Sequence, residues 1–145
     1  YLAKSPEELK ALSKKLGHEV VVVQSFIAND SDYRVIVYKG EPRFVMRRFR
    51  DPNSDTHLNN VSMGAGAEEM GVESLTPEAK DAVLTAARLT GRSGYAGVDL
   101  MYELGTNKPY ILEVNKKPDI VTGATKELID TKLQLFEERV RDLLK

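Results

Sequence analysis

The chain contains no cysteine, and its 145 residues include only two histidines, His18 and His57. The absence of cysteine excludes disulfides, thiolate nucleophiles and cysteine-ligated zinc, and it is compatible with a reducing cytoplasm, where we expect the protein to act. Two histidines are also too few for a histidine-rich metal site. Any catalytic or binding chemistry must therefore come from other side chains.

Long apolar runs and an excess of one charge are absent as well. Lys+Arg number 21 against 22 Asp+Glu, a formal net charge of -1, so no broad basic field favours nucleic acid or membrane as a partner. No apolar run approaches the roughly 20 residues that cross a bilayer. With 41% hydrophobic residues, the chain can bury the core of one domain. A polyanionic ligand would have to be bound by a local cluster of charges.

The first third of the chain predicts a helix, a buried strand and a hairpin. Residues 5–8, Ser-Pro-Glu-Glu, combine a capping serine, a proline suited to the first helical position and a capping-box glutamate, and this helix should end by Gly17. Residues 19–27, EVVVVQSFI, are β-branched and nearly all apolar, which favours a buried strand. Residues 33–49 predict two strands joined at Lys-Gly-Glu-Pro, residues 39–42.

The remainder predicts a long loop, a helix, a second hairpin and a closing helix. Residues 50–71 are polar and glycine-rich, typical of a long loop that is functional or disordered and that can hold a short strand. Residues 76–91 open with Thr-Pro-Glu and place apolar side chains at helical spacing, namely Ala79, Val83, Ala86, Ala87 and Leu89. Residues 125–145 predict a helix with one apolar face, made of Leu128, Leu135, Phe136, Val140 and Leu143. Because hairpins dominate, we expect an α+β fold with a largely antiparallel sheet and helices packed on one face.

The second hairpin carries acidic residues in an unusual position. It reads GVDLMYELGTNKPYILEVNKKPD over residues 97–119, and with the turn centred near Thr106, Asp99 falls opposite Glu113. Asn115 shares the face of Glu113, because strand side chains alternate. Opposed like charges destabilise a strand pair. A divalent cation between these oxygen ligands would compensate. Alternatively, one carboxylate faces solvent, or Lys116 and Lys117 fold back to neutralise the pair.

Arginines near the ends of the first hairpin add a second clue. Arg34 lies near the start of one predicted strand, and Arg47 and Arg48 lie near the end of the next. Arg34 and Arg48 share a face only if the register of the hairpin permits it. Guanidinium groups beside a metal neutralise charge on a transferred phosphoryl group. Considered alone, however, an arginine pair on a strand is more typical of a solvated sheet face.

Several short motifs together resemble a known family. In order, they are VVVQSFI, DYR, MRR, NNVSMGAG and GVDLMYE followed by PYILEVNKKP. This order resembles the ATP-grasp ligases, and among them the RimK-like branch of glutamate ligases and related carboxylate-amine ligases. The likeness runs from about residue 20 to residue 118 and continues into the closing helix. It implies the carboxyl-terminal lobe of an ATP-grasp enzyme, which phosphorylates a carboxylate with ATP and joins it to an amine.

The resemblance also implies roles for individual residues. Asp99, Glu113 and Asn115 would bind two Mg²⁺ ions that bridge the ATP phosphates. Arg34 would contact the transferred phosphoryl group and the acyl-phosphate. Arg48, with Arg47 beside it, is similar to a second arginine that binds phosphate or substrate.

Nucleotide and substrate contacts are implied elsewhere in the chain. Asn60 resembles the asparagine that opens a glycine-containing substrate loop, here ending at Gly64 and Gly66. The expected nucleotide-binding residues are a hinge strand whose backbone meets adenine, together with the aspartate of the DYR triplet, namely Gln24, Ser25, Phe26, Ile27 and Asp32. Expected ligands are therefore ATP, Mg²⁺, and carboxylate and amine substrates that are small molecules or peptides.

The resemblance divides the chain at residue 27. Residues 1–27 resemble the end of a preceding lobe plus the hinge, and residues 28–145 resemble the carboxyl-terminal lobe with its metal and phosphate site. We expect the missing amino-terminal lobe of the same protein to complete the ATP site, so that this chain alone binds ATP weakly and turns over little. After Asn60 the chain reads Val-Ser-Met where the glutamate ligases commonly have Leu-His-Arg, which predicts a different acid or acceptor.

Other interpretations remain open. A small-polyol kinase of the ATP-grasp type would share the acidic hairpin but need no acyl-phosphate site. A non-catalytic ATP-grasp-like domain would keep the fold to bind a partner. Residues 63–66, Met-Gly-Ala-Gly, can cradle phosphate or form a simple turn, and they lack the lysine and Ser/Thr of a P-loop. His57 fits a solvated loop position better than a substrate contact.

Overall fold

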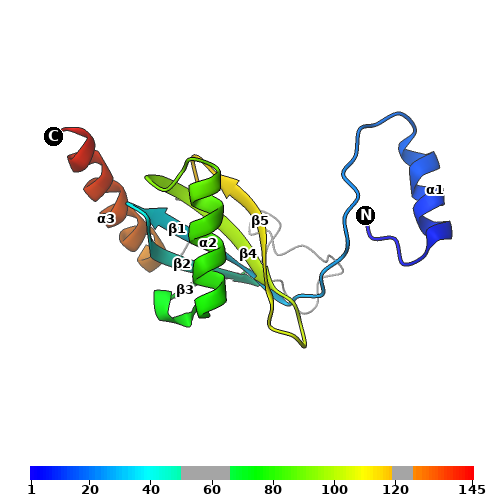
Figure 1. The fold of residues 1–145 in the computed structure, drawn as a ribbon, viewed down its shortest axis with the longest axis horizontal. Coiled ribbons are helices and arrows are strands. Elements are labelled where there is room, and N and C mark those ends of the chain that lie inside the picture. The colour runs from blue at the N-terminus through cyan, green and yellow to red at the C-terminus, as the bar shows by residue number, and fades with distance from the viewer. Residues whose placement is uncertain (50–65, 119–125) are drawn as a thin grey trace.

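The computed structural model describes residues 1–49, 66–118 and 126–145. Five strands form one antiparallel sheet in the order β3-β2-β1-β4-β5 (Figure 1). In chain order the elements are α1 (Pro6–Leu16), β1 (Ser31–Tyr38), β2 (Glu41–Phe49), β3 (Gly66–Met70), the short 3-10 helix η2 (Val72–Ser74), α2 (Pro77–Leu89), β4 (Tyr95–Tyr102), β5 (Pro109–Asn115) and α3 (Lys126–Leu143). The predicted α+β class and antiparallel sheet are confirmed.

The β1–β2 hairpin turns where the sequence predicts. Lys39 and Gly40 have φ angles of 53° and 77°, so both central residues lie in the left-handed region. Two consecutive positive φ values are typical of a type I′ turn, whose twist matches the twist of the flanking strands. Next to the turn, Tyr38 pairs with Glu41 and Val37 with Pro42. A register shift between Ile36 and Val37 then moves the pairing by one residue, so that Arg34 pairs with Met46 and Asp32 pairs with Arg48.

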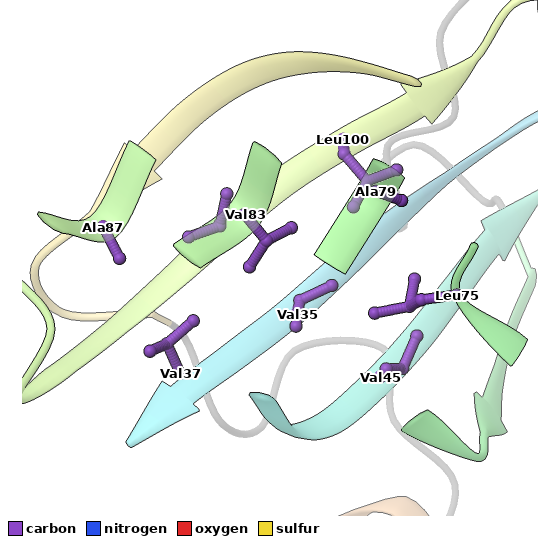
Figure 2. Packing of buried hydrophobic residues seen from close by; sticks show 9 residues of the cluster. Val35, Val37, Val45, Leu75, Ala79, Val83, Ala87 and Leu100 are labelled. Atoms are coloured by element: carbon purple, nitrogen blue, oxygen red, sulfur yellow. The ribbon is translucent and has the colours of Figure 1, made fainter. Parts of the chain in front are cut away.

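One face of the sheet carries the main hydrophobic core, which α2 covers (Figure 2). Alternate strand residues Val35, Val37 and Val45 pack with Leu100 against the buried face of the helix. The buried side chains of α2 are Ala79, Val83 and Ala87, all fully excluded from solvent. The predicted helix and its face are therefore confirmed, except that Leu89 is 75% exposed because it falls at the end of the helix.

The opposite face is divided between an apolar patch and a polar patch. The polar patch consists of Asp32, Arg34, Arg48, Asp99, Glu113 and Asn115. The apolar patch consists of Ile36, Tyr38, Phe44 and Met46, and Leu135 of α3 packs on it. Ion pairs reinforce this contact, because Lys39 Nζ lies 2.6 Å from Asp142 Oδ2 and Arg43 Nη2 lies 2.8 Å from Glu138 Oε2. The expectation that the helices share one face is therefore wrong for α3. From Val35 to Tyr38, β1 is apolar on both faces, and each face packs against its own helix.

The predicted apolar face of α3 is only partly buried. Leu135 is 9% exposed, whereas Phe136 is 39% and Leu143 is 74% exposed. The side chain of Leu128 lies outside the described residues. Helical spacing identified the amphipathic helix, but the sheet offers it room for only a short contact. Of the helices in the described part of the chain, none has the length and apolar character that a bilayer crossing requires.

The amino-terminal segment departs most from expectation. α1 forms as predicted, and Ser5 Oγ accepts a hydrogen bond from the Glu8 backbone N–H at 3.2 Å. However, α1 buries no residue and stands apart from the sheet (Figure 1). Residues 19–27 form no strand, and Val20 and Val22 are 101% and 87% exposed, so the predicted buried strand is wrong. No described strand pairs with these residues, and β-branched composition alone does not make a strand.

Candidate functional site

Six polar side chains occupy the polar patch on the face opposite α2. Strand pairing brings them together, because Arg34 of β1 pairs with Asp99 of β4, and Asp99 pairs with Glu113 of β5. The remaining members are Asp32, Arg48 and Asn115, which the alternation of β1, β2 and β5 places on the same face. The predicted opposition of Asp99 and Glu113 is confirmed, and so is a register that lets Arg34 and Arg48 share a face.

Asp99 is the centre of this cluster. Only 3% exposed, it accepts three charge-assisted hydrogen bonds. Arg34 donates from Nε to Oδ1 at 2.8 Å and from Nη2 to Oδ2 at 2.7 Å, and Arg48 donates from Nη2 to Oδ2 at 3.0 Å. Burial acts to raise the pKa of Asp99, but hydrogen bonds and charge from both arginines outweigh it, and the pKa lies below its ordinary value. Hydrogen bonding to Asp99 also raises the pKa of Arg34.

Asp32 contacts Arg48 rather than solvent. Its Oδ1 accepts a hydrogen bond from Arg48 Nε at 2.5 Å, and both side chains are about nine-tenths buried, with 12% and 11% exposed. Burial raises the pKa of Asp32 in spite of the nearby guanidinium charge of Arg48. The sequence put Asp32 among nucleotide contacts but did not reveal this partner. The spacing in the sequence does indicate that Asp32 belongs to the same cluster as Arg34, because residues two apart on one strand share a face.

Glu113 and Asn115 form the exposed side of the cluster. Asn115 Nδ2 donates to Glu113 Oε1 at 2.6 Å, and Arg34 Nη2 lies 3.8 Å from the same oxygen. The Glu113 side chain is 56% exposed. Repulsion between Asp99 and Glu113 is thus relieved by an arginine that contacts both. Lys116 and Lys117 are exposed, and neither forms an ion pair with another described residue, so these lysines do not neutralise the acids.

The backbone turns sharply after Asn115, because Pro118 packs over Gly97. A Cβ atom at Gly97 would lie 2.6 Å from Pro118 Cβ, closer than carbon atoms approach. Gly97 pairs with Asn115 across the β4–β5 hairpin. The lack of a side chain at Gly97 therefore gives Pro118 room to pack beside the polar patch.

The polar patch offers oxygen ligands of the kind that a hard cation such as Mg²⁺ prefers. Asp99 and Glu113 supply carboxylates and Asn115 a carboxamide, and Mg²⁺ takes such oxygen ligands together with water and phosphate. From the described residues, Asp99 Oδ1 accepts one hydrogen bond, so it keeps a lone pair, and Glu113 Oε2 accepts none. No three His, Cys, Asp or Glu side chains in the described part of the chain are placed so that together they could hold a metal ion, so a cation here would depend on Asn115 and water.

Other predicted site residues lie elsewhere. Gln24, Ser25, Phe26 and Ile27 lie in the extended segment before β1, so the expected hinge strand is not formed. Asn60, His57 and Gly64 lie outside the described residues, while Gly66 begins β3.

Arg47 pairs with Tyr33 in the register, which puts it on the face opposite Arg48, where its Nη1 donates to Glu68 at 3.1 Å. Arg47 therefore does not join the polar patch.

Comparison with known proteins identifies the family. A family model described as the RimK-like ATP-grasp domain matches residues 1–138. The chain belongs to the RimK-like ATP-grasp family. This assignment confirms the resemblance drawn from the motifs. None of the curated proteins matches the chain.

Solved structures share the fold of this RimK-like ATP-grasp chain. D-alanine–D-alanine ligase from Bacillus anthracis complexed with ATP has a TM-score of 0.58 at 17% identity, covering 95% of this chain and 49% of its own. The ATP-grasp ligase PsnB, complexed with a phosphomimetic variant of a minimal precursor, Mg and ADP, has a TM-score of 0.54 at 19% identity, covering 80% of this chain and 35% of its own. The chain thus spans half or less of these ligases.

Proposed function

We propose that this chain is the carboxyl-terminal lobe of an ATP-dependent carboxylate-amine ligase and that its polar patch binds the nucleotide phosphates. The observation that carries the proposal is the convergence of Arg34 and Arg48 on Asp99, from three neighbouring strands, beside Glu113. Buried guanidinium groups next to exposed carboxylate oxygens suit a ligand that combines anionic phosphate with a cation. Membership of the RimK-like ATP-grasp family supports the same ligand.

Each residue of the patch then has a chemical task. Asp99, Glu113 and Asn115 would hold Mg²⁺, which when bound neutralises phosphate charge. Arg34 and Arg48 use their Nε and Nη2 groups on carboxylates, and the Nη1 group of each makes no hydrogen bond to a described residue. Those Nη1 groups can donate to phosphate oxygens and stabilise charge on the transferred group. We propose Asn60, which lies in the sequence between β2 and β3, as a substrate contact.

The proposed reaction has two steps. The terminal phosphoryl group of ATP moves to a carboxylate oxygen, giving an acyl-phosphate and ADP. An amine nitrogen then attacks the acyl carbon, phosphate leaves, and the nitrogen loses a proton to give an amide. The patch contains no Ser, Thr, Cys, Lys or His, and this route needs no covalent enzyme intermediate. PsnB is described with a minimal precursor. For this chain we propose a carboxylate and an amine carried on small molecules or peptides as the substrate classes.

We assign residues 1–27 to the end of a preceding lobe and its hinge. The full exposure of Val20 and the unpaired extended backbone around it support this division, because such a segment is suited to pair with another part of the fold. Gln24, Ser25, Phe26 and Ile27 would offer backbone groups to adenine. The chain spans 35% and 49% of the two solved ligases, so the remaining part of the ATP site would come from the other lobe.

Calorimetry tests the binding part of this proposal. ATP should bind the 145-residue chain weakly and only when Mg²⁺ is present. Asp99→Asn should lose most of this affinity, and the affinity that is left should no longer depend on Mg²⁺. Asp81→Asn, an exposed charge-removing change on α2, is the matched control and should bind like the unmodified chain. Affinity that is unaffected by Mg²⁺ and by Asp99→Asn would contradict the proposal.

Product analysis tests the chemistry in a protein that contains both lobes. With ATP and a carboxylate substrate, hydroxylamine should replace the natural amine and trap the acyl-phosphate as a hydroxamate. ADP and phosphate should form in equal amounts with the product. A phosphorylated alcohol formed without any amine would instead indicate a kinase.

A further inference from the structure

Among the acidic residues of the polar patch, only Asp32 forms no hydrogen bond or ion pair with Arg34. Its Oδ1 accepts a hydrogen bond from Arg48 Nε at 2.5 Å, and Nη2 of the same guanidinium donates to Asp99 Oδ2 at 3.0 Å. The strand order is β2-β1-β4, so Arg48 of β2 crosses over β1 to reach Asp99 on β4. Asp32 lies on β1, directly in that path, as the register partner of Arg48.

We propose that Asp32 is a positioning residue, which aims Arg48 at Asp99 and at the nucleotide phosphates without itself touching the ligand. This inference rests on the proposed phosphate-binding function. Asp32 is unsuited to a direct contact with phosphate, because its Oδ1 is already bound by Arg48 Nε and a carboxylate repels phosphate. Its role is instead to fix a long, flexible side chain in one geometry.

The two arginines differ in how they are held. Arg34 pairs with Asp99 in the register and binds it with both Nε and Nη2, so it needs no further support. Arg48 donates one hydrogen bond to Asp99 and a second one to Asp32. An arginine loses much rotamer freedom when it is fixed, and a planar guanidinium anchored along one edge presents its remaining Nη1 in a fixed direction. Without Asp32, Arg48 keeps its charge but loses this orientation.

A double-mutant cycle on binding separates an indirect role from a direct one. The probe is inorganic tripolyphosphate with Mg²⁺, which contains the phosphate part of the ligand and no adenine. Its affinity is measured by calorimetry for the unmodified chain, Asp32→Asn, Arg48→Gln and the double variant. Asp32→Asn should weaken binding about tenfold, the effect expected from one misplaced charge-assisted hydrogen bond. In the Arg48→Gln background, the same change should have no further effect.

Control variants separate charge, fold and position. Asp81→Asn, which removes an equal charge from the opposite side of the molecule, should leave the affinity unchanged. Asp32→Glu keeps the acceptor and its charge and should recover most of the affinity. If Asp32→Asn lowers the folded fraction, Asp32→Glu also serves as the folded variant for comparison.

The NMR chemical shift of the Arg48 Nε–H group reports the position of this side chain without any ligand. Asp32→Asn should change this chemical shift and leave that of the Arg34 Nε–H group unchanged.

The possible outcomes distinguish this inference from the proposed function. If the unmodified chain does not bind tripolyphosphate, the proposed function of the patch fails. If the unmodified chain binds and Asp32→Asn lowers the affinity equally with and without Arg48, Asp32 contacts the ligand or its cation directly and the inference is wrong. Tighter binding by Asp32→Asn would also overturn it, since it would mean that the Asp32 charge only repels the anion.

Discussion

Asp99 shows how a charged residue can occupy the interior of a sheet. Its carboxylate is nearly inaccessible, and its charge is balanced by Arg34 and Arg48 through three hydrogen bonds. A buried ion pair of this kind costs much desolvation energy, and it remains favourable only while both partners are present. The cluster is therefore sensitive to loss of any one member.

Replacing Asp99 by asparagine should destabilise the chain by about 3 kcal/mol, because two largely buried guanidinium groups lose their charged acceptor. Urea unfolding followed by far-UV circular dichroism measures this change. Glu113→Gln is the matched comparison, since Glu113 has a 56% exposed side chain, and its effect should stay within about 0.5 kcal/mol. A more stable Asp99→Asn variant would mean that repulsion from Glu113 outweighs the arginine contacts.

Asp142 should give the docking of α3 a dependence on acid pH. Hydrogen bonds from Lys39 and Tyr38 lower the pKa of Asp142 from 3.8 to about 2. Because the folded-state pKa is depressed, this carboxylate adds stability above about pH 4, and that contribution is lost as the pH falls toward about 2.

Acid titration of stability tests this prediction. Between pH 4 and pH 2, the unmodified chain should lose more stability than Asp142→Asn does. Lys39→Met removes the cationic partner of Asp142, so this variant should also lose less stability between pH 4 and pH 2 than the unmodified chain. Parallel curves for the unmodified chain and Asp142→Asn would show that this ion pair does not contribute.

The helices differ in how much of their predicted faces they bury. α2 inserts three fully buried side chains into the core beneath it. Among the described side chains of α3, only Leu135 is a buried hydrophobic residue, and polar and cation–π contacts, including the ion pairs of Glu138 and Asp142, accompany it. Both helices have comparable amphipathic patterns in the sequence. The extent of burial is decided by the surface that the sheet presents, which a single-helix pattern does not contain.

Val83 provides the test at the centre of α2. Truncation to alanine removes two buried carbon atoms and leaves a cavity, so Val83→Ala should lower the unfolding free energy by about 2 kcal/mol. Leu89→Ala, on the same helix at a position 75% exposed, should change it by less than about 0.5 kcal/mol. Equal effects measured by urea unfolding would contradict the assigned face.

Considered as a whole, the molecule consists of a packed sheet unit and an exposed amino-terminal segment. α1 buries no residue, and the valines that follow it are exposed by 101%, 49%, 87% and 68%, namely Val20, Val21, Val22 and Val23. Exposed β-branched residues in an extended backbone are a template for pairing with other chains. This segment should contribute little to the stability of the sheet and much to self-association.

Deletion of residues 1–23 should therefore leave the urea midpoint unchanged and reduce association at high concentration. The deletion keeps Asn29, whose side-chain amide bonds to the Ile27 carbonyl, and the Ala28 carbonyl that accepts the Leu104 N–H. Sedimentation velocity measures the association, and circular dichroism measures the midpoint. A large loss of stability would mean that the amino-terminal segment packs on the sheet.

Local patterns in the sequence were sufficient for most elements of this fold. Capping residues and helical spacing located α1 and α2, a Lys-Gly turn located the β1–β2 hairpin, and equal distances from a turn placed Asp99 opposite Glu113. Each of these features depends on residues close together in the chain. Residues 19–27 show the limit, because a strand needs a partner, and no described strand pairs with this segment.

The partners of the charged residues depended on contacts distant in the chain. Arg34 and Asp99 are 65 residues apart, and Arg48 and Asp99 are 51 apart, so their contact follows from how β1, β2 and β4 align. Composition and spacing identified the acids and arginines as candidates. The sheet register made them one buried cluster, and it moved Arg47, the immediate neighbour of Arg48, to the opposite face, because side chains of adjacent strand residues point to opposite sides.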